Sequence, residues 1–130
     1  MKGDPRLRSP LGRALGLGSA KEGVAHWWAQ RLTAVALIPL SIWFVAALIA
    51  LTGADHDTLV GWLHKPFPAI VTILLLAVAF YHMALGVQVV IEDYVHSEWL
   101  KISALVLNKF VALLLAVSGI FAVLRIAFQG

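Results

Sequence analysis

The side chain best placed to do chemistry in this sequence is a histidine inside a long apolar segment. His82 lies in the uncharged run 66–91, which is followed directly by Glu92, Asp93 and Tyr94. Placing an ionisable side chain in hydrocarbon costs free energy, so its presence there indicates a functional site. Histidine also serves as an axial ligand of haem iron. The segment therefore combines a potential metal ligand inside a membrane with polar side chains at the membrane edge.

The residues alone leave three roles open for His82. Its imidazole can bind haem iron, hydrogen-bond to a neighbouring helix, or relay protons. Gly86 lies four residues later on the same helix face, where the missing side chain leaves room for a flat ligand. Ala84 and Gly86 are also small enough to permit close contact between helices. The spacing therefore fits either a bound ligand or helix packing.

Asp93 and Tyr94 follow His82 at the end of the same predicted helix. Eleven residues of helix return Asp93 to nearly the face of His82, about 16 Å further along the axis. A phenol at that depth can donate a hydrogen bond to a quinone carbonyl, and a carboxylate can orient it or relay protons. The alternatives are an aromatic side chain at the membrane interface for Tyr94 and a helix-end charge for Asp93.

His26 and Arg31 begin the first apolar segment. Five residues turn a helix by about 140°, so the two side chains do not share a face. The Arg31 guanidinium can pair with carboxylates such as haem propionates, or it can anchor the chain at the cytoplasmic interface. We assign no metal to the remaining histidines, which are typical of solvated loops: His56, His64 and His96.

The composition indicates a membrane protein without a soluble active site. Of the 130 residues, 61% are hydrophobic and 13% are charged, whereas soluble domains carry about 25% charged residues. The chain has no cysteine, so disulfides, cysteine-bound zinc and iron–sulfur ligation within it are excluded. The sequence has no P-loop, Gly-x-Ser-x-Gly or Ser–His–Asp pattern, and we predict no catalytic residue.

Three long apolar runs predict an all-α integral membrane protein. Transmembrane helices are expected at about 29–51, 66–91 and 102–128, each long enough for the ~20 residues that cross a bilayer. They form a three-helix membrane anchor over residues 25–130. A polar tail with glycine and proline, residues 1–24, precedes it.

The distribution of lysine and arginine predicts the orientation of the spans. The loop expected at 52–65 holds only Lys65, whereas six such cations lie in the tail and at the first span: Lys2, Arg6, Arg8, Arg13, Lys21 and Arg31. The positive-inside rule then places the N-terminus in the cytoplasm, or the equivalent matrix, and the C-terminus on the other side. We expect the tail to be retained rather than removed as a targeting peptide. No aromatic-interleaved basic patch indicates a nucleic-acid partner.

Two stretches of the sequence resemble a known family. Residues 26–31 (HWWAQR) are similar to the His-Trp-x-x-x-Arg pattern of mitochondrial-type anchors. Residues 82–96 read as His-x-x-x-Gly-x-Gln-Val-Val-x-x-Asp-Tyr-Val-His, which is the more specific match. Together they resemble the small hydrophobic membrane anchor of succinate dehydrogenase (respiratory complex II), also called its cytochrome b small subunit. The tail and the third span match only in character.

The resemblance implies a place in an enzyme complex. The chain would pair with a second three-helix anchor subunit of the cytochrome b556 type, and the two would share one haem b through one axial histidine from each. Flavoprotein and iron–sulfur subunits would oxidise succinate to fumarate and pass electrons to ubiquinone or another quinone, joining the tricarboxylic acid cycle to the respiratory chain. The implied location is the lipid bilayer of the bacterial inner (plasma) membrane, with the mitochondrial inner membrane as the alternative.

The resemblance also implies roles for individual side chains. His82 matches the axial ligand of the haem iron, and Gly86 lies where the haem would pack. Tyr94, with Asp93 beside it, matches the quinone-site position. Arg31 matches the arginine near the haem propionates and the quinone pocket.

Other assignments stay open at this point. His26 is a further cofactor-binding candidate, although its spacing from the arginine varies among bacterial anchors. A haem b anchor of another quinone-linked complex, such as fumarate reductase, fits the same residues. A cofactor-free, three-helix structural or assembly protein is the alternative from a different class. A b-type haem spectrum and its reduction by succinate separate these functions.

Overall fold

The protein forms a small set of long helices in one layer. The computed structural model describes residues 19–129. Within them lie four helices: α2 (Ser19–Ala50), α3 (His56–His64), α4 (Pro66–Tyr94) and α5 (Glu98–Phe128). The expected polar tail therefore lies mostly outside the described residues, and its last residues belong to α2.

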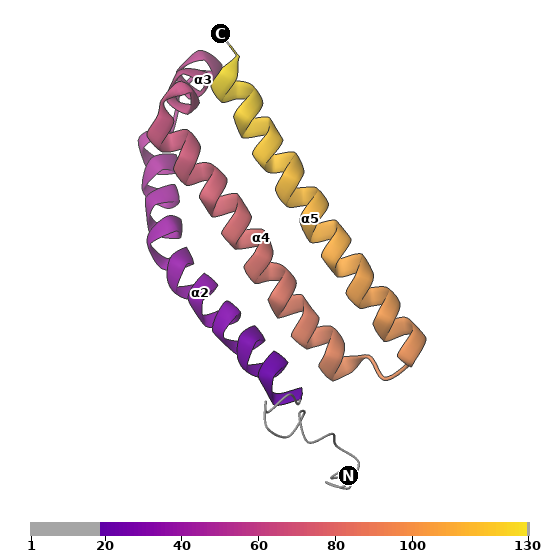
Figure 1. The fold of residues 1–130 in the computed structure, drawn as a ribbon. Helices are drawn as coiled ribbons and strands as arrows, with labels where there is room; N and C mark the ends of the chain where they lie inside the picture. The colour runs from indigo at the N-terminus through magenta and orange to yellow at the C-terminus, as the bar shows by residue number, and fades with distance from the viewer. Residues whose placement is uncertain (1–18, 130) are drawn as a thin grey trace, which may run out of the picture.

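The central helix of the layer is α4, which packs against α2 on one side and α5 on the other (Figure 1). In the described part of the chain, α2 and α5 do not contact each other. The start of α2 and the α4–α5 connection lie at one end of the layer, whereas α3 and the C-terminus lie at the other (Figure 1). The arrangement confirms an all-α fold with α4 in position to join two neighbours.

Three of the helices are long and apolar enough to cross a membrane: Gly23–Ala50, Pro66–Tyr94 and Glu98–Phe128. The three spans predicted from the sequence are therefore confirmed. With 29 residues in α4 and 31 in α5, these helices are about 44 and 46 Å long at 1.5 Å per residue. That exceeds the ~30 Å hydrocarbon core, so both helices extend into the headgroup layers.

The helix ends differ from the expected ones for a physical reason. The first helix begins at Ser19 rather than near residue 29, and α4 continues to Tyr94. Hydropathy marks only the part of a helix that lies in hydrocarbon, whereas the backbone hydrogen bonds continue through the interface. Trp27 and Trp28 lie in this interfacial part of α2, with ring centroids 5.1 Å apart.

The short loop expected at 52–65 contains a helix, α3. Asp55 caps its start, because the Asp55 carboxylate accepts a 2.9 Å hydrogen bond from the Thr58 backbone N–H. Hydrogen bonding from the Thr58 side chain and backbone lowers the pKa of the Asp55 carboxyl below its ordinary value. An acidic residue at this position is a preferred helix cap. The sequence analysis took this segment as a loop because nine residues are too few for a helical period to be recognised clearly.

Aromatic side chains pack α3 against the membrane helices. The Trp62 ring stacks on Trp43 of α2, with centroids 5.7 Å apart, and Phe67 of α4 meets Trp43 edge-on at 6.1 Å. The His64 Nδ1 lies 3.2 Å from the backbone oxygen of Ala127, near the end of α5. The aromatic cluster and the His64–Ala127 contact together link α3 to all three spans at the end of the layer opposite the α4–α5 connection.

The described residues bury few side chains against one another. The buried hydrophobic residues are small or medium in size: Ala69, Leu85, Ala112 and Val123. Large apolar side chains such as Ile42 and Phe110 are about two-thirds exposed, at 66% and 67%. Lipid tails or other membrane helices must cover these surfaces, because so much exposed apolar area is not compatible with water.

Candidate functional site

The candidate ligand lies at the middle of the central helix. His82 is the seventeenth of the 29 residues of α4, which places it about 24 Å from Pro66 and about 18 Å from Tyr94 along the axis. Its side chain is partly buried. The structure therefore places this imidazole near the middle of a helix that is long and apolar enough to cross a membrane.

The His82 ring is held by a threonine of the neighbouring helix. Thr33 Oγ1 lies 2.9 Å from His82 Nδ1 and donates to the backbone oxygen of Ala29 at 2.7 Å. A hydroxyl has only one proton, and Thr33 uses it for the hydrogen bond to Ala29. We therefore assign a proton to His82 Nδ1, which donates a hydrogen bond to Thr33 Oγ1. The other ring nitrogen, Nε2, then keeps its lone pair. This is the tautomer that an axial metal ligand needs.

The side of α2 that faces α4 carries more polar groups than the sequence analysis identified. His26, Gln30 and Thr33 follow one another at helical spacing and share this face. His26 Nε2 and Gln30 Oε1 are buried and have no hydrogen-bond partner among the described residues. Buried polar atoms are normally paired, so both atoms require a polar partner beyond this face. The missed signal was this spacing of polar residues in an apolar helix.

Gly86 lies beside this polar face but is not required by the packing of α2. A Cβ at this glycine would be 3.9 Å from Gln30 Nε2, which is ordinary van der Waals contact. Gly119 in α5 differs, because a Cβ there would lie 3.2 Å from Leu76 Cδ1 of α4. An alanine side chain would therefore fit at Gly86 without displacing any residue of this chain.

Arg31 lies on the opposite side of α2 from Thr33, since two residues turn a helix by about 200°. Its guanidinium lies 5.4 Å from the ring centroid of Trp27, and the side chain is exposed. The structure does not bring Arg31 to His82 within this chain. The exposed guanidinium can reach only a ligand or subunit that covers this side of the helix.

Asp93 and Tyr94 end α4 and are both exposed, Tyr94 by 77%. The contacts of Thr33 with His82 and of Gln30 with Gly86 fix an antiparallel register between α2 and α4. We call this interface, with His26, Gln30 and Thr33 on α2 and His82 and Gly86 on α4, the seam. His26 lies further along the seam, in the direction of Asp93. The polar residues of the α2–α4 interface therefore lie in a row from His82, in the middle of α4, to Asp93 and Tyr94 at its exposed end.

The other histidines lie apart from this seam. His56 is exposed and lies 3.5 Å from Asp57, and His96 is exposed in the α4–α5 connection. Residues 19–129 contain no group of three or more histidine, cysteine or acidic side chains arranged to hold a metal ion. The arrangement around His82 therefore offers one nitrogen ligand from the described residues.

Comparison with known proteins gives the family. The sequence model of the succinate dehydrogenase/fumarate reductase transmembrane subunit family matches residues 5–121. The chain belongs to this family. No solved structure shows significant similarity to it.

Several curated relatives cover most of the chain. The succinate dehydrogenase hydrophobic membrane anchor subunit of Rickettsia bellii (strain RML369-C) is 34% identical over 117 residues, covering 90% of this chain and 94% of the relative. The protein of the same name from Paracoccus denitrificans is 37% identical over 89 residues, with 68% and 69% covered. The succinate dehydrogenase membrane anchor subunit of Reclinomonas americana is 30% identical over 96 residues, with 72% and 80% covered.

These similarities confirm the resemblance found in the two sequence motifs. The chain is a succinate dehydrogenase membrane anchor subunit, a multi-pass protein of the inner membrane and a non-catalytic part of an enzyme complex. The ligands of the seam between α2 and α4 stay predictions.

Proposed function

We propose that the chain binds haem b and quinone in a succinate:quinone oxidoreductase and tethers the flavoprotein and iron–sulfur subunits to the membrane. The observation that carries the proposal is the hydrogen bond between Thr33 and His82. It holds an imidazole at mid-membrane depth in one orientation and leaves Nε2 as the lone-pair donor. Orientation of a ligating histidine through its other nitrogen is typical of metal sites.

The residues around His82 suit a haem. Gly86 leaves space on the same helix face, and the buried polar atoms of His26 and Gln30 require partners outside the described residues. Arg31 lies on another side of α2, and its guanidinium suits a carboxylate of the propionate type where the haem or the second anchor subunit covers that side. When bound, haem supplies a one-electron carrier between the iron–sulfur subunit and the membrane. Since this seam contributes a single central histidine, we infer that the second axial ligand comes from the second anchor subunit.

The quinone site lies at the exposed end of α4 in this proposal. The Tyr94 phenol donates a hydrogen bond to a quinone carbonyl oxygen, and the Asp93 carboxylate orients the phenol or passes a proton. Quinone reduction to quinol takes up two electrons and two protons, so a site near the aqueous phase suits the reaction. The high exposure of Tyr94 leaves its ring free to contact the ligand and the iron–sulfur subunit.

The experiment is purification of the intact complex by a tag on this chain. We expect the flavoprotein, the iron–sulfur subunit and a second anchor to co-purify, with succinate-dependent reduction of quinone and of a b-type haem. A preparation that binds no haem would support the cofactor-free alternative. Reduction of the haem by quinol but not by succinate would support a fumarate reductase, which the family description also covers.

A further inference from the structure

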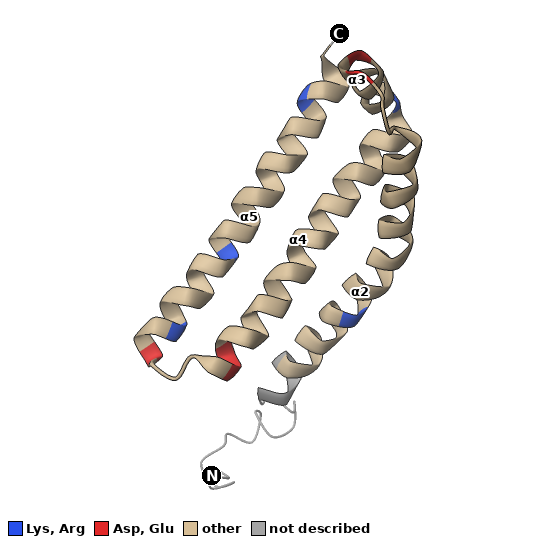
Figure 2. Ribbon diagram, turned by 180° about the vertical axis from the view of Figure 1, so that it is seen from behind, with Lys and Arg blue, Asp and Glu red and all other residues tan. Residues whose placement is uncertain are grey.

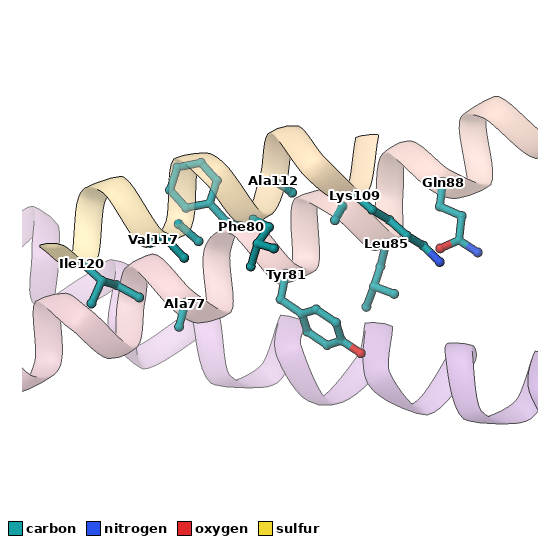
Figure 3. A pocket seen from close by; sticks show the side chains of 12 residues that line it. Ala77, Phe80, Tyr81, Leu85, Gln88, Lys109, Ala112, Val117 and Ile120 are labelled. Carbon is teal, nitrogen blue, oxygen red and sulfur yellow. The ribbon is translucent and has the colours of Figure 1, made fainter. Parts of the chain in front are cut away.

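A groove between α4 and α5 lies apart from the residues assigned to haem and quinone. It encloses about 400 Å³, within the range of small-molecule sites. The small side chains of alanines on both helices leave the space of the groove, and the aromatic rings of Phe80 and Tyr81 border it (Figure 3). The alanines are Ala77, Ala84, Ala112 and Ala116. His82, Gly86, Asp93 and Tyr94 do not line this groove.

The two ends of the groove differ in chemistry. One end is apolar and is formed by Ala77 and Ile120, whereas the other holds Gln88 and the ammonium-bearing side chain of Lys109 (Figure 3). Lys109 is the one charged residue among those that line the groove. Charged residues are sparse along the helices (Figure 2), so this lysine gives the groove a single cationic end.

Lys109 needs a negatively charged partner. It lies eleven residues into α5 from Glu98, about 16 Å along the axis. With α5 centred on the hydrocarbon core and extending about 8 Å beyond it at each end, Lys109 lies about 8 Å inside that core, and its ammonium can snorkel toward the headgroups. No carboxylate of residues 23–129 pairs with it, since their one ion pair joins His56 and Asp57. A cation at this depth normally has a partner.

The length of the groove is close to the length of an acyl chain in one leaflet of a bilayer. From Lys109 to Ile120 the α5 axis rises by about 16 Å, and half of the ~30 Å hydrocarbon core is about 15 Å. A single acyl chain therefore spans the groove when its glycerophosphate lies at the Lys109 end. The apolar lining and the single cation have the same polarity as a phospholipid in that leaflet.

We propose that the groove between α4 and α5 binds an anionic phospholipid. One acyl chain lies between the two helices from Gln88 to Ile120, and the Lys109 ammonium holds the phosphate. Gln88 already donates from Nε2 to Glu92 Oε1 at 3.0 Å, so its remaining oxygen is an acceptor for the same ammonium. The lipid neutralises the exposed Lys109 ammonium and fills the space that the alanines leave.

A photo-reactive residue in the groove identifies the occupant. Val117, which lines the groove, is replaced by a photo-crosslinking amino acid in the intact complex, in membranes that contain phosphatidylglycerol. Leu114 of the same helix is 66% exposed and does not line the groove, so it serves as the matched control. We expect the adducts at position 117 to be enriched in phosphatidylglycerol above its fraction in the membrane, whereas adducts at position 114 follow the bulk lipid composition. A protein adduct at 117 would assign the groove to another subunit and overturn the proposal.

The role of the cation is tested separately. Delipidated complex is reconstituted with phosphatidylglycerol or phosphatidylcholine, and retained lipid is counted by native mass spectrometry. We expect Lys109→Met to lower phosphatidylglycerol retention about tenfold, as for loss of one charge-assisted hydrogen bond, and Lys109→Arg to preserve it. Lys101→Met removes a cation of α5 outside the groove and should change little. Equal retention in Lys109→Met and Lys101→Met would refute a lipid held at Lys109.

Discussion

Thr33 and His82 meet across the interface of α2 and α4, with 2.9 Å between Thr33 Oγ1 and His82 Nδ1. The contact joins a polar residue of the first span to the central imidazole of the second span. It sets the ring orientation and leaves the lone pair of Nε2 free, which is the nitrogen that would bind iron in the proposed function. The first prediction therefore concerns the threonine rather than the histidine.

Thr33→Val should disturb the haem without preventing assembly. The variant keeps the shape of the side chain but removes the acceptor of the Nδ1 proton, and loss of such a partner lowers metal affinity by about 10–100-fold. We expect lower haem occupancy and a shifted midpoint potential in a potentiometric titration of the complex. Thr33→Ser keeps the hydroxyl and should behave like the unaltered protein. Identical potentials and haem content in Thr33→Val would show that the contact does not orient the ligand.

Tyr94→Phe should slow quinone reduction. A neutral hydrogen bond contributes about 1 kcal/mol net, so quinone turnover should fall several-fold, while succinate oxidation by an artificial acceptor upstream of quinone stays near normal. Asp93→Asn should act in the same direction if the carboxylate orients the phenol. Tyr81→Phe removes the other tyrosine hydroxyl of the chain, away from the proposed site, and is the matched control. Full quinone reductase activity in Tyr94→Phe would make Tyr94 an interfacial anchor.

The two glycines of the helix interfaces should respond differently to substitution. Gly119→Val places side-chain atoms against Leu76, and overpacking of this kind costs about 1–3 kcal/mol. A lower melting temperature of the complex is expected. Gly86→Ala meets no close atom of this chain, so we expect normal thermal stability with a changed haem spectrum. An unchanged spectrum would mean that no haem packs against Gly86.

The ends of the helix layer should lie on opposite sides of the membrane. Because the chain has no cysteine, single variants at Asp57 in α3 and Glu98 at the start of α5 report on the two ends. An impermeant maleimide should label position 57 from outside intact cells and position 98 only in inverted vesicles. Labelling after solubilisation measures the total reactive thiol. Labelling of position 98 from outside would reverse the predicted orientation.

The sequence predicted the three spans well, because they depend on the cost of placing residues in hydrocarbon. Charge-free runs of sufficient length mark the spans, and His82 is conspicuous in one of them. The family followed from the motifs around the same residue. None of these inferences requires knowledge of how the helices rotate or slide against one another.

The contacts between helices depend on rotation and register, which the sequence does not determine by itself. Thr33 lies in the first apolar span, and its contact with His82 is visible only when α2 is aligned with α4. Gln30 belongs to the same polar face. Conversely, Arg31 follows Gln30 directly yet lies on another side of α2, because consecutive helical residues differ by about 100°.

The most direct test of the account is the axial ligation of the haem in the intact complex. The electron paramagnetic resonance spectrum of the ferric haem is compared between His82→Ala and His56→Ala, which removes an exposed histidine outside the seam. The account predicts that the low-spin signal and the b-type optical spectrum are lost or shifted in His82→Ala alone, while the complex still assembles. An unchanged low-spin signal in assembled His82→Ala complex would contradict it.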